Sequence, residues 1–452
     1  MPNIFAYVML IAWPIFSIFF YKKLDTITAT FLTIVGGYLL LPVRVEIDLP
    51  LVPALDQNTI PAIAAILCCR FIKNIDINLI PSSGAERWIV ILLLLLPLVT
   101  ILTNSEPVFN GVVWKSGLTI YDSISAIILA YLKILPFIVA GQIIKSHEDL
   151  TLLIKLIIIS GLFYSILVLF EIRMSPKLHT WIYGFFPHSW GQQARFGGFR
   201  AIVFMGHGLL VSMFLAVCLA AAVINFKNKI RAFYIPPILI VIYFLIVLIL
   251  NKSVGSVIFG SLLVLCIALL PIYLIKRITQ LIISLVILYP LLSMFGLFPH
   301  FEIIEFANEM SPQRAQSLEF RFFHEMKLLE HAQEKLFFGW GAWGRNRLSD
   351  SVTDGYWIIA LSSYGIIGFS LLFGLAVVSI QKSIKASTLI SNKSQQLSIV
   401  SFALLLSIIM LDQIPNSSLH SWSWFLIGAL IGRSNYIFEQ GKRPKFNHKV
   451  AC

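Results

Sequence analysis

The chain has 452 residues, of which 58% are hydrophobic and only 12% are charged, and its formal net charge at pH 7 is +12. This composition is far from that of soluble globular domains, and repeated apolar runs of about 17 to 25 residues are typical of membrane-spanning helices. We therefore predict an all-α, polytopic membrane helical bundle that forms a single membrane domain over residues 1–452, whose positive charge reflects membrane topology rather than nucleic-acid binding.

The apolar runs predict about 12 to 14 spans. In chain order they cover residues 4–20, 26–41, 59–72, 88–103, 120–141, 151–171, 200–224, 232–250, 253–270, 278–298, 355–380, 397–411 and 420–432. Lys and Arg collect on alternate connections, for example at Lys22, Lys23, Lys227 and Lys229, and cytoplasmic loops retain such residues. We therefore expect a multi-pass plasma-membrane protein with its N-terminus outside and its C-terminus in the cytoplasm. The first span lacks a basic n-region and a cleavage site, so we expect it to be retained.

The sequence indicates neither a cofactor nor a metal. Its five cysteines lie in apolar spans or at the extreme C-terminus, so we expect no disulfide framework or thiolate metal site outside. It contains no Walker A motif, no dinucleotide fingerprint and no Asp-x-Asp pair. Energy is therefore expected to enter with a membrane substrate or an ion gradient.

The first external loop with concentrated positive charge covers residues 172–200. It ends in Arg195-Phe196-Gly197-Gly198-Phe199-Arg200 and runs into a predicted span that contains His207. Arg200 and His207 would share one helical face, about 10 Å apart at a rise of 1.5 Å per residue. Arginine pairs bidentately with phosphate oxygens, and an ionisable group at membrane depth is costly without a partner. Arg195, Arg200 and His207 are thus candidates for binding an anionic substrate; headgroup anchoring and a His bonded to a neighbouring helix are the alternatives.

The second external loop, residues 299–355, is a dense polar block with nine Asp/Glu, six Lys/Arg and three His. It is too long for an ordinary connection, and loops of that length are usually functional or disordered. Ser311-Pro312 is a good helix start, and the helix is expected to run to about Phe338. One flank of its apolar arc is cationic and comprises Arg314, Ser317, Arg321, His324, His331 and Lys335. A cationic stripe beside an apolar strip indicates an anionic, partly lipidic ligand, although an amphipathic helix on the outer membrane face is the alternative.

A glycine-rich aromatic turn, residues 337–345, follows this helix. Its glycines permit close backbone approach to a ligand, which makes Trp340 and Arg345 candidate substrate contacts; an interfacial Trp anchor is the alternative. Asp354 stands at the mouth of the next span, where it is either a helix cap or a general base. His324 and Glu325 are the other candidates for the base.

Two weaker signals involve polar residues in or beside spans. Lys133 lies in the middle of a predicted span and could snorkel or pair with Glu171 or Asp122. Three polar residues border the last external loop and could line the same cavity as the block: Asp412, Asn416 and His420.

In this order, these pieces resemble the O-antigen polymerase and ligase superfamily of the bacterial envelope. The resemblance rests on the Arg195–Arg200 loop, a Ser-containing turn at 251–255, Arg321 about 18 residues before Gly-Trp-Gly at 339–341, Asp354, and Gly365-x-x-Gly368. It covers roughly residues 190–370, and the rest of the chain only by hydropathy.

The resemblance implies a GT-C-like glycosyltransferase in the bacterial inner membrane, with a glycan on undecaprenyl pyrophosphate as donor. Arg195 or Arg200, together with Arg321, would hold the pyrophosphate. A chain-length regulator and a flippase are the protein partners it suggests. Ligases of the family carry a His, commonly followed by Asn, where this sequence has Asp354-Gly355, which favours a polymerase.

The predicted function is therefore polymerisation of lipid-linked oligosaccharide repeat units of O-antigen, capsule or exopolysaccharide, by inverting, metal-independent glycosyl transfer at the outer face of the membrane. The first alternative is a ligase that moves finished polymer to lipid A core or protein. The second is a polysaccharide transporter or flippase, whose site would lie at the membrane midplane between repeated halves with discontinuous helices.

Overall fold

The computed structural model describes residues 1–49, 52–195, 197–229 and 235–442. Strands in these residues are limited to three short antiparallel hairpins. They are β1 (Ile47–Leu49) with β2 (Val52–Leu55), β3 (Val108–Phe109) with β4 (Trp114–Lys115), and β5 (Ala194–Arg195) with β6 (Gly198–Phe199). Everything else of regular structure is helical, which confirms the predicted helical class.

Eight helices in the described residues are long and apolar enough to cross a membrane. They are α1 (Ile4–Lys23), α5 (Ala85–Leu102), α6 (Ile120–Ile143), α7 (His147–Met174), α9 (Gly208–Lys227), α12 (Ile272–Met294), α15 (Tyr356–Ala386) and α16 (Lys393–Asp412). Four apolar helical segments are shorter: Thr26–Leu40, which comprises α2 (Thr26–Phe31), η1 (Leu32–Gly36) and α3 (Gly37–Leu40); α4 (Thr59–Phe71); α10 (Pro237–Leu250); and α11 (Val254–Leu269). The polytopic membrane character is thus confirmed, while the number of about 12 to 14 spans stays a prediction.

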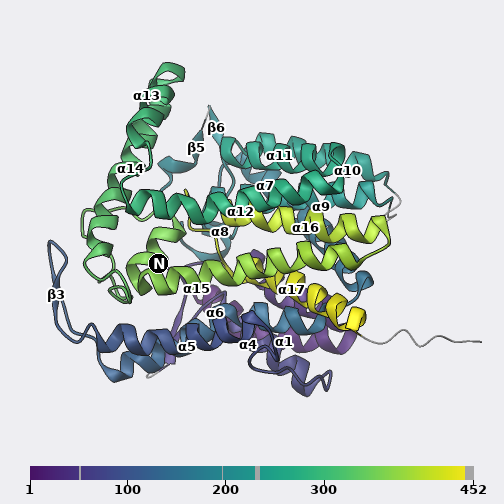
Figure 1. Cartoon of the computed structure of the whole chain (residues 1–452), viewed down its shortest axis with the longest axis horizontal. Helices are drawn as coiled ribbons and strands as arrows, with labels where there is room; N and C mark the ends of the chain where they lie inside the picture. The colour runs from purple at the N-terminus through teal and green to yellow at the C-terminus, as the bar shows by residue number, and fades with distance from the viewer. Residues whose placement is uncertain (50–51, 196, 230–234, 443–452) are drawn as a thin grey trace, which may run out of the picture.

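The long helices run side by side along the longest axis of the molecule (Figure 1). One end, here called the loop end, carries the N-terminus, α8 (Leu178–Tyr183), the β3–β4 and β5–β6 hairpins, α13 (His300–Met310) and α14 (Pro312–Gln333) (Figure 1). The opposite end, the tail end, is where α17 (Ser421–Lys442) finishes. Helix α9 is the most enclosed, because α7, α10, α11 and α16 pack around it.

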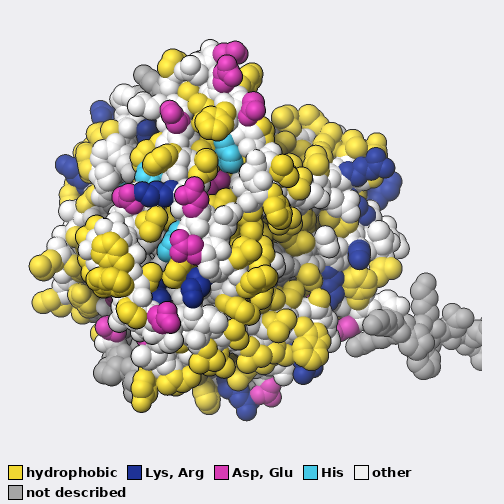
Figure 2. Space-filling view, turned by 60° about the vertical axis from the view of Figure 1, so that its left-hand side comes forward, with side chains coloured by type: hydrophobic (Ala, Val, Ile, Leu, Met, Phe, Trp, Pro, Cys, Tyr) yellow, Lys and Arg dark blue, Asp and Glu magenta, His cyan; other side chains and the backbone are white. Residues whose placement is uncertain are grey.

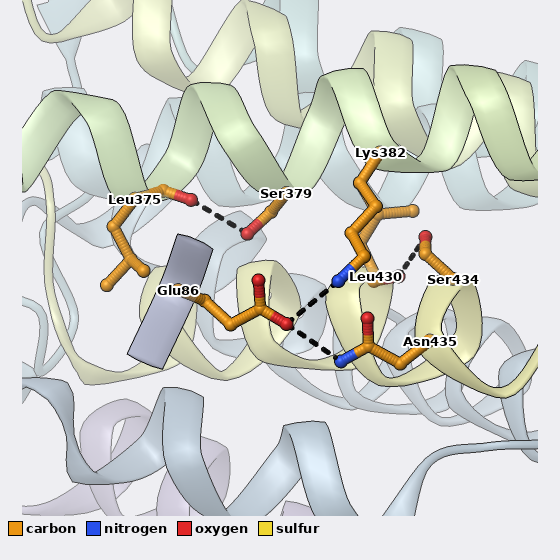
Figure 3. A network of polar contacts seen from close by, with 7 residues as sticks. All are labelled: Glu86, Leu375, Ser379, Lys382, Leu430, Ser434 and Asn435. Atoms are coloured by element: carbon orange, nitrogen blue, oxygen red, sulfur yellow. Dashed lines mark hydrogen bonds and ion pairs between the residues drawn. The ribbon is translucent and has the colours of Figure 1, made fainter. Parts of the chain in front are cut away.

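A buried polar network near the tail end ties three helices together. Glu86 at the start of α5 is 1% exposed, and its Oε1 accepts hydrogen bonds from Lys382 Nζ of α15 at 2.9 Å and from Asn435 Nδ2 of α17 at 3.1 Å (Figure 3). A buried carboxylate is tolerable only with such partners, so removal of Lys382 alone would leave an uncompensated charge.

Helix α15 is broken at Gly365, whose φ of 67° and ψ of −172° are accessible essentially to glycine alone. At the break, carbonyl and N–H groups of α15 form hydrogen bonds to residues outside the helix. Trp340 N–H donates to the Ser362 carbonyl at 2.8 Å, and Gly341 N–H donates to that of Ser363 at 2.9 Å. In return, Ile366 N–H donates to the carbonyl of Leu336 at 2.7 Å. The turn after α14 therefore packs into the break and provides hydrogen-bond partners for its backbone groups, as buried backbone within a membrane bundle requires.

Two helix boundaries differ from the prediction. The helix that begins at Pro312 ends at Gln333 rather than near Phe338, and a further helix, α13, precedes it. Residues 200–207 are not helical, since α9 begins at Gly208 with His207 as its N-cap. The cause is Glu171, whose Oε2 accepts the N–H groups of Ile202 at 2.9 Å and Val203 at 2.8 Å. Arg200 and His207 therefore do not share a helical face.

Candidate functional site

A cavity of about 300 Å³ lies at the loop end between α12, α14, the start of α15 and the loop that follows α16. Its polar lining comprises Tyr289, Arg321, His324, Glu325 and Asp354. All three predicted candidates for the base and one predicted phosphate-binding arginine thus meet in one cavity. In the view turned toward this end, basic, acidic and His side chains gather close together, with hydrophobic side chains around them (Figure 2).

Helix periodicity explains how α14 contributes to this cavity. Positions 321, 324, 325 and 328 follow each other at the three- and four-residue spacing of one helical face, and all four side chains line the cavity. Leu328 is buried and fixes this face against the bundle. The ring of His324 lies edge-on between Phe320 and Phe323, with centroids 4.3 and 5.4 Å away.

Asp354 lines the same cavity from a different segment, the residues directly before α15. Its Oδ2 lies 3.5 Å from Arg321 Nε, and the two side chains are 42% and 37% exposed. The N-cap of α15 is Gly355, and no side chain caps that helix end, so Asp354 does not act as a cap. Gly355 is needed here, because a Cβ atom on it would stand 2.2 Å from the Ile414 carbonyl oxygen.

Glu325 is the more enclosed carboxylate. Its Oε1 accepts a hydrogen bond from the Tyr289 hydroxyl at 2.5 Å and lies 3.9 Å from His300 Nε2. The side chains of Glu325 and His300 are only 14% and 10% exposed. The His300 ring is wedged between those of Phe298 and Phe322, with centroids 4.8 and 4.7 Å away. Glu325 therefore lines the cavity and also lies next to His300.

Arg200 lies close enough to Arg195 and Arg321 for their charges to interact. Burial, and then the charges of Arg195 and Arg321, lower the pKa of Arg200 to about 10. Arg200 is nearly fully buried, and its Nη2 donates to the Gln192 carbonyl at 3.1 Å. The three arginines thus concentrate positive charge at the loop end.

His207 lies within the same positive field. Burial, followed by repulsion from Arg200, lowers the pKa of His207 to about 3, so the imidazole is neutral at pH 7. Its Nδ1 accepts the N–H of Leu209 at 3.1 Å, as expected of an N-cap side chain. His207 thus has a local structural role in addition to its position beside the arginines.

Two predicted substrate contacts have structural surroundings instead. Arg345 is 2% exposed and donates to the carbonyls of Ser116 at 2.7 Å, Glu106 at 3.0 Å and Trp340 at 3.3 Å. The Trp340 indole N–H donates to the His331 carbonyl at 2.6 Å, and the two rings stack 4.5 Å apart. Both residues attach the turn after α14 to its neighbours and neither lines the cavity. The side chain of Arg314 lies outside the described part of the chain, so that prediction stays open.

The polar residues predicted to pair with Lys133 or to line the cavity have other partners. Glu171 and Asp122 do not pair with Lys133; Glu171 accepts backbone N–H groups, and Asp122 forms a capping box with Thr119. Asp412 is buried and accepts from Ser418 Oγ at 2.7 Å and Asn416 Nδ2 at 2.8 Å. This network shapes the loop, but Ile414 and Pro415 of that loop line the cavity rather than Asp412, Asn416 or His420.

Sequence reasoning missed Tyr289 and His300. A Tyr near the end of a span is typical of the interfacial aromatic belt, and His300 is simply the second residue of the polar block. Only the return of α14 over the end of α12 brings them to Glu325.

Within the residues that the structure describes, no group of three or more His, Cys, Asp and Glu side chains is arranged to hold a metal ion. A scan against models of known protein families finds no match to this chain, and a search of curated proteins finds none either.

Proposed function

We propose that the chain is an integral membrane glycosyltransferase of the bacterial inner membrane that polymerises undecaprenyl-pyrophosphate-linked oligosaccharide repeat units of O-antigen, capsule or exopolysaccharide. The observation that carries the proposal is the meeting of Arg321, His324, Glu325 and Asp354 in one cavity at the loop end. By the positive-inside distribution of Lys and Arg, this end faces outward, where lipid-linked glycans are polymerised in the family that the sequence resembles.

The reaction is an inverting displacement. A hydroxyl oxygen at the non-reducing end of one lipid-linked unit attacks the anomeric carbon of the second glycan, and the bond from that carbon to the pyrophosphate oxygen breaks. The electron pair stays on the pyrophosphate, which needs charge stabilisation more than protonation. Arg321, with Arg200 and Arg195 nearby, supplies that positive charge.

The acceptor proton passes to a carboxylate, and we favour Glu325 over Asp354. Asp354 faces Arg321 at 3.5 Å and is better suited to hold that arginine in place. Glu325 is enclosed, held by the Tyr289 hydroxyl, and next to His300. His324 is the remaining candidate for orienting the acceptor.

A ligase stays the nearest alternative, and one packing feature argues against it. The position after Asp354 accommodates only glycine, because Ile414 O approaches within 2.2 Å of where a Cβ would stand. An Asn at this position, as in the ligase pattern, would require a different path of the loop after α16.

Deletion in the native host separates the three functions. Loss of a polymerase leaves single-repeat glycans, loss of a ligase accumulates lipid-linked polymer, and loss of a flippase traps lipid-linked units on the cytoplasmic face. Complementation with Arg321→Ala should leave protein abundance unchanged and fail to restore chain extension. Arg347→Ala is the matched control, since Arg347 lies in the same block, is exposed and does not line the cavity. Normal polymer from Arg321→Ala would refute the proposal.

A further inference from the structure

The apolar surface of α12 does not stop where that span ends. Along the helix, Leu281, Leu285 and Leu288 are exposed, as expected for side chains that face lipid. Beyond it, the exposed apolar side chains continue across the turn and along α13, each between 64% and 78% exposed: Phe295, Leu297, Phe301, Phe306 and Met310. Exposed apolar residues in such a continuous series mark an interaction surface.

Helix α13 separates its apolar and acidic residues. At 100° per residue, Phe306, Met310 and Ile303 fall within one arc of about 60°, and Glu302, Glu305 and Glu309 fall within a neighbouring arc of about the same width. Phe301 lies on the other flank of the acidic arc. The helix contains no Lys or Arg. Its adhesion to a surface would therefore rest on insertion of apolar side chains and not on attraction to anionic headgroups.

The orientation of the α13–α14 hairpin fits a membrane surface. The hairpin lies across the direction of the long helices at the loop end, and α13 extends beyond the side of the bundle (Figure 1). The view turned by 60° shows the hairpin projecting in the same way, with hydrophobic and acidic side chains on it (Figure 2). A helix in this position runs parallel to the membrane plane, at the level where the spans end.

A second cavity, of about 440 Å³, opens beneath the hairpin between the end of α12 and both of its helices. Its lining is mixed: Met294, Leu297, Phe301 and Met326 are apolar, and His300, Glu302, Glu330 and Gln333 are polar or charged. Since Met294 is the last residue of α12, this cavity adjoins the end of a helix whose leucines are exposed.

We propose that the α13–α14 hairpin is a membrane-surface arm: α13 inserts Phe306 and Met310 into the leaflet at the loop end. This inference does not depend on the glycosyltransferase proposal, since any lipid of that leaflet satisfies it.

Spin labelling of the full chain in lipid nanodiscs of phosphatidylethanolamine and phosphatidylglycerol tests the arm. A label is placed at Phe306→Cys and, as the matched control on the acidic side, at Glu305→Cys, in a Cys452→Ser background; the remaining cysteines are buried. Oxygen partitions into lipid and a water-soluble nickel complex does not. We expect the label at 306 to be relaxed several-fold more by oxygen than by nickel, and the label at 305 to show the reverse.

A pair of labels at Met310→Cys and Glu309→Cys repeats the comparison one turn further, so that a local distortion at 306 does not decide the outcome. Equal nickel accessibility at both positions of each pair would place the arm in water and overturn the proposal. Dipolar broadening between labels at 306 would instead identify a second copy of the chain as the occupant, which also overturns it.

Discussion

Replacement of Arg345 by Ala should cost stability and not substrate affinity. The guanidinium is the donor to three backbone carbonyls, those of Glu106, Ser116 and Trp340, in a residue that is only 2% exposed. Each buried acceptor left without a donor costs about 1 to 3 kcal/mol. Three such losses amount to roughly 3 kcal/mol even at the lower limit, a large share of the about 5 to 15 kcal/mol that holds a typical protein folded.

The assay is thermal unfolding of the purified protein in detergent, followed by intrinsic fluorescence from its ten tryptophans. Arg345→Ala should lower the melting temperature markedly, Arg345→Lys should recover part of the loss, and Arg347→Ala should leave it near that of the wild type. If Arg345→Ala melts like the wild type but makes no polymer, the anchoring role is wrong and Arg345 binds substrate.

Three further outcomes are expected. Gly365→Ala should destabilise the protein by more than about 2 kcal/mol, because φ is +67° and a Cβ would stand 2.2 Å from Phe337; Gly374→Ala, where a Cβ meets nothing within 4 Å, is the control in the same melting assay. His207 has a folded-state pKa of about 3, below the unfolded value of about 6.5, so wild-type stability should fall by about 2 kcal/mol between pH 8 and pH 5, and melting of His207→Gln should show a smaller fall. Glu325→Gln should reduce glycosyl transfer in membrane vesicles by roughly 100-fold or more if it is the base, with Glu319→Gln near wild type; equal activities would remove Glu325 from the mechanism.

Much of the architecture follows from local rules. Apolar length alone marks the long spans, and the three-residue spacing of Arg321 and His324 alone predicts that these two side chains lie on one flank of the helix. Asp354 could be placed near them because the chain must return to the membrane at the same end as the block. These features depend only on residues close together in sequence.

The features that sequence reasoning missed depend on partners far apart. Glu171 holds the backbone at Ile202 and Val203, which keeps residues 200–207 out of the predicted helix. Arg345 looked like a ligand contact because its acceptors, near residues 106 and 116, lie more than 200 positions away. Hydropathy and periodicity carry no information on such pairs.

The break in α15 bears on the choice between a glycosyltransferase and a transporter. Discontinuous helices in transporters present unpaired backbone dipoles to an ion or substrate near the midplane. Here the carbonyls of Ser362 and Ser363 accept from the turn at residues 340–341, and Ile366 N–H is likewise bonded. The backbone groups at the break are thus hydrogen-bonded to the turn after α14 and are not left free for a solute. Its effect is to fix the end of α14, and with it the positions of Arg321 and Glu325, against the membrane bundle, which is what the proposed glycosyltransferase requires of the cavity at the loop end.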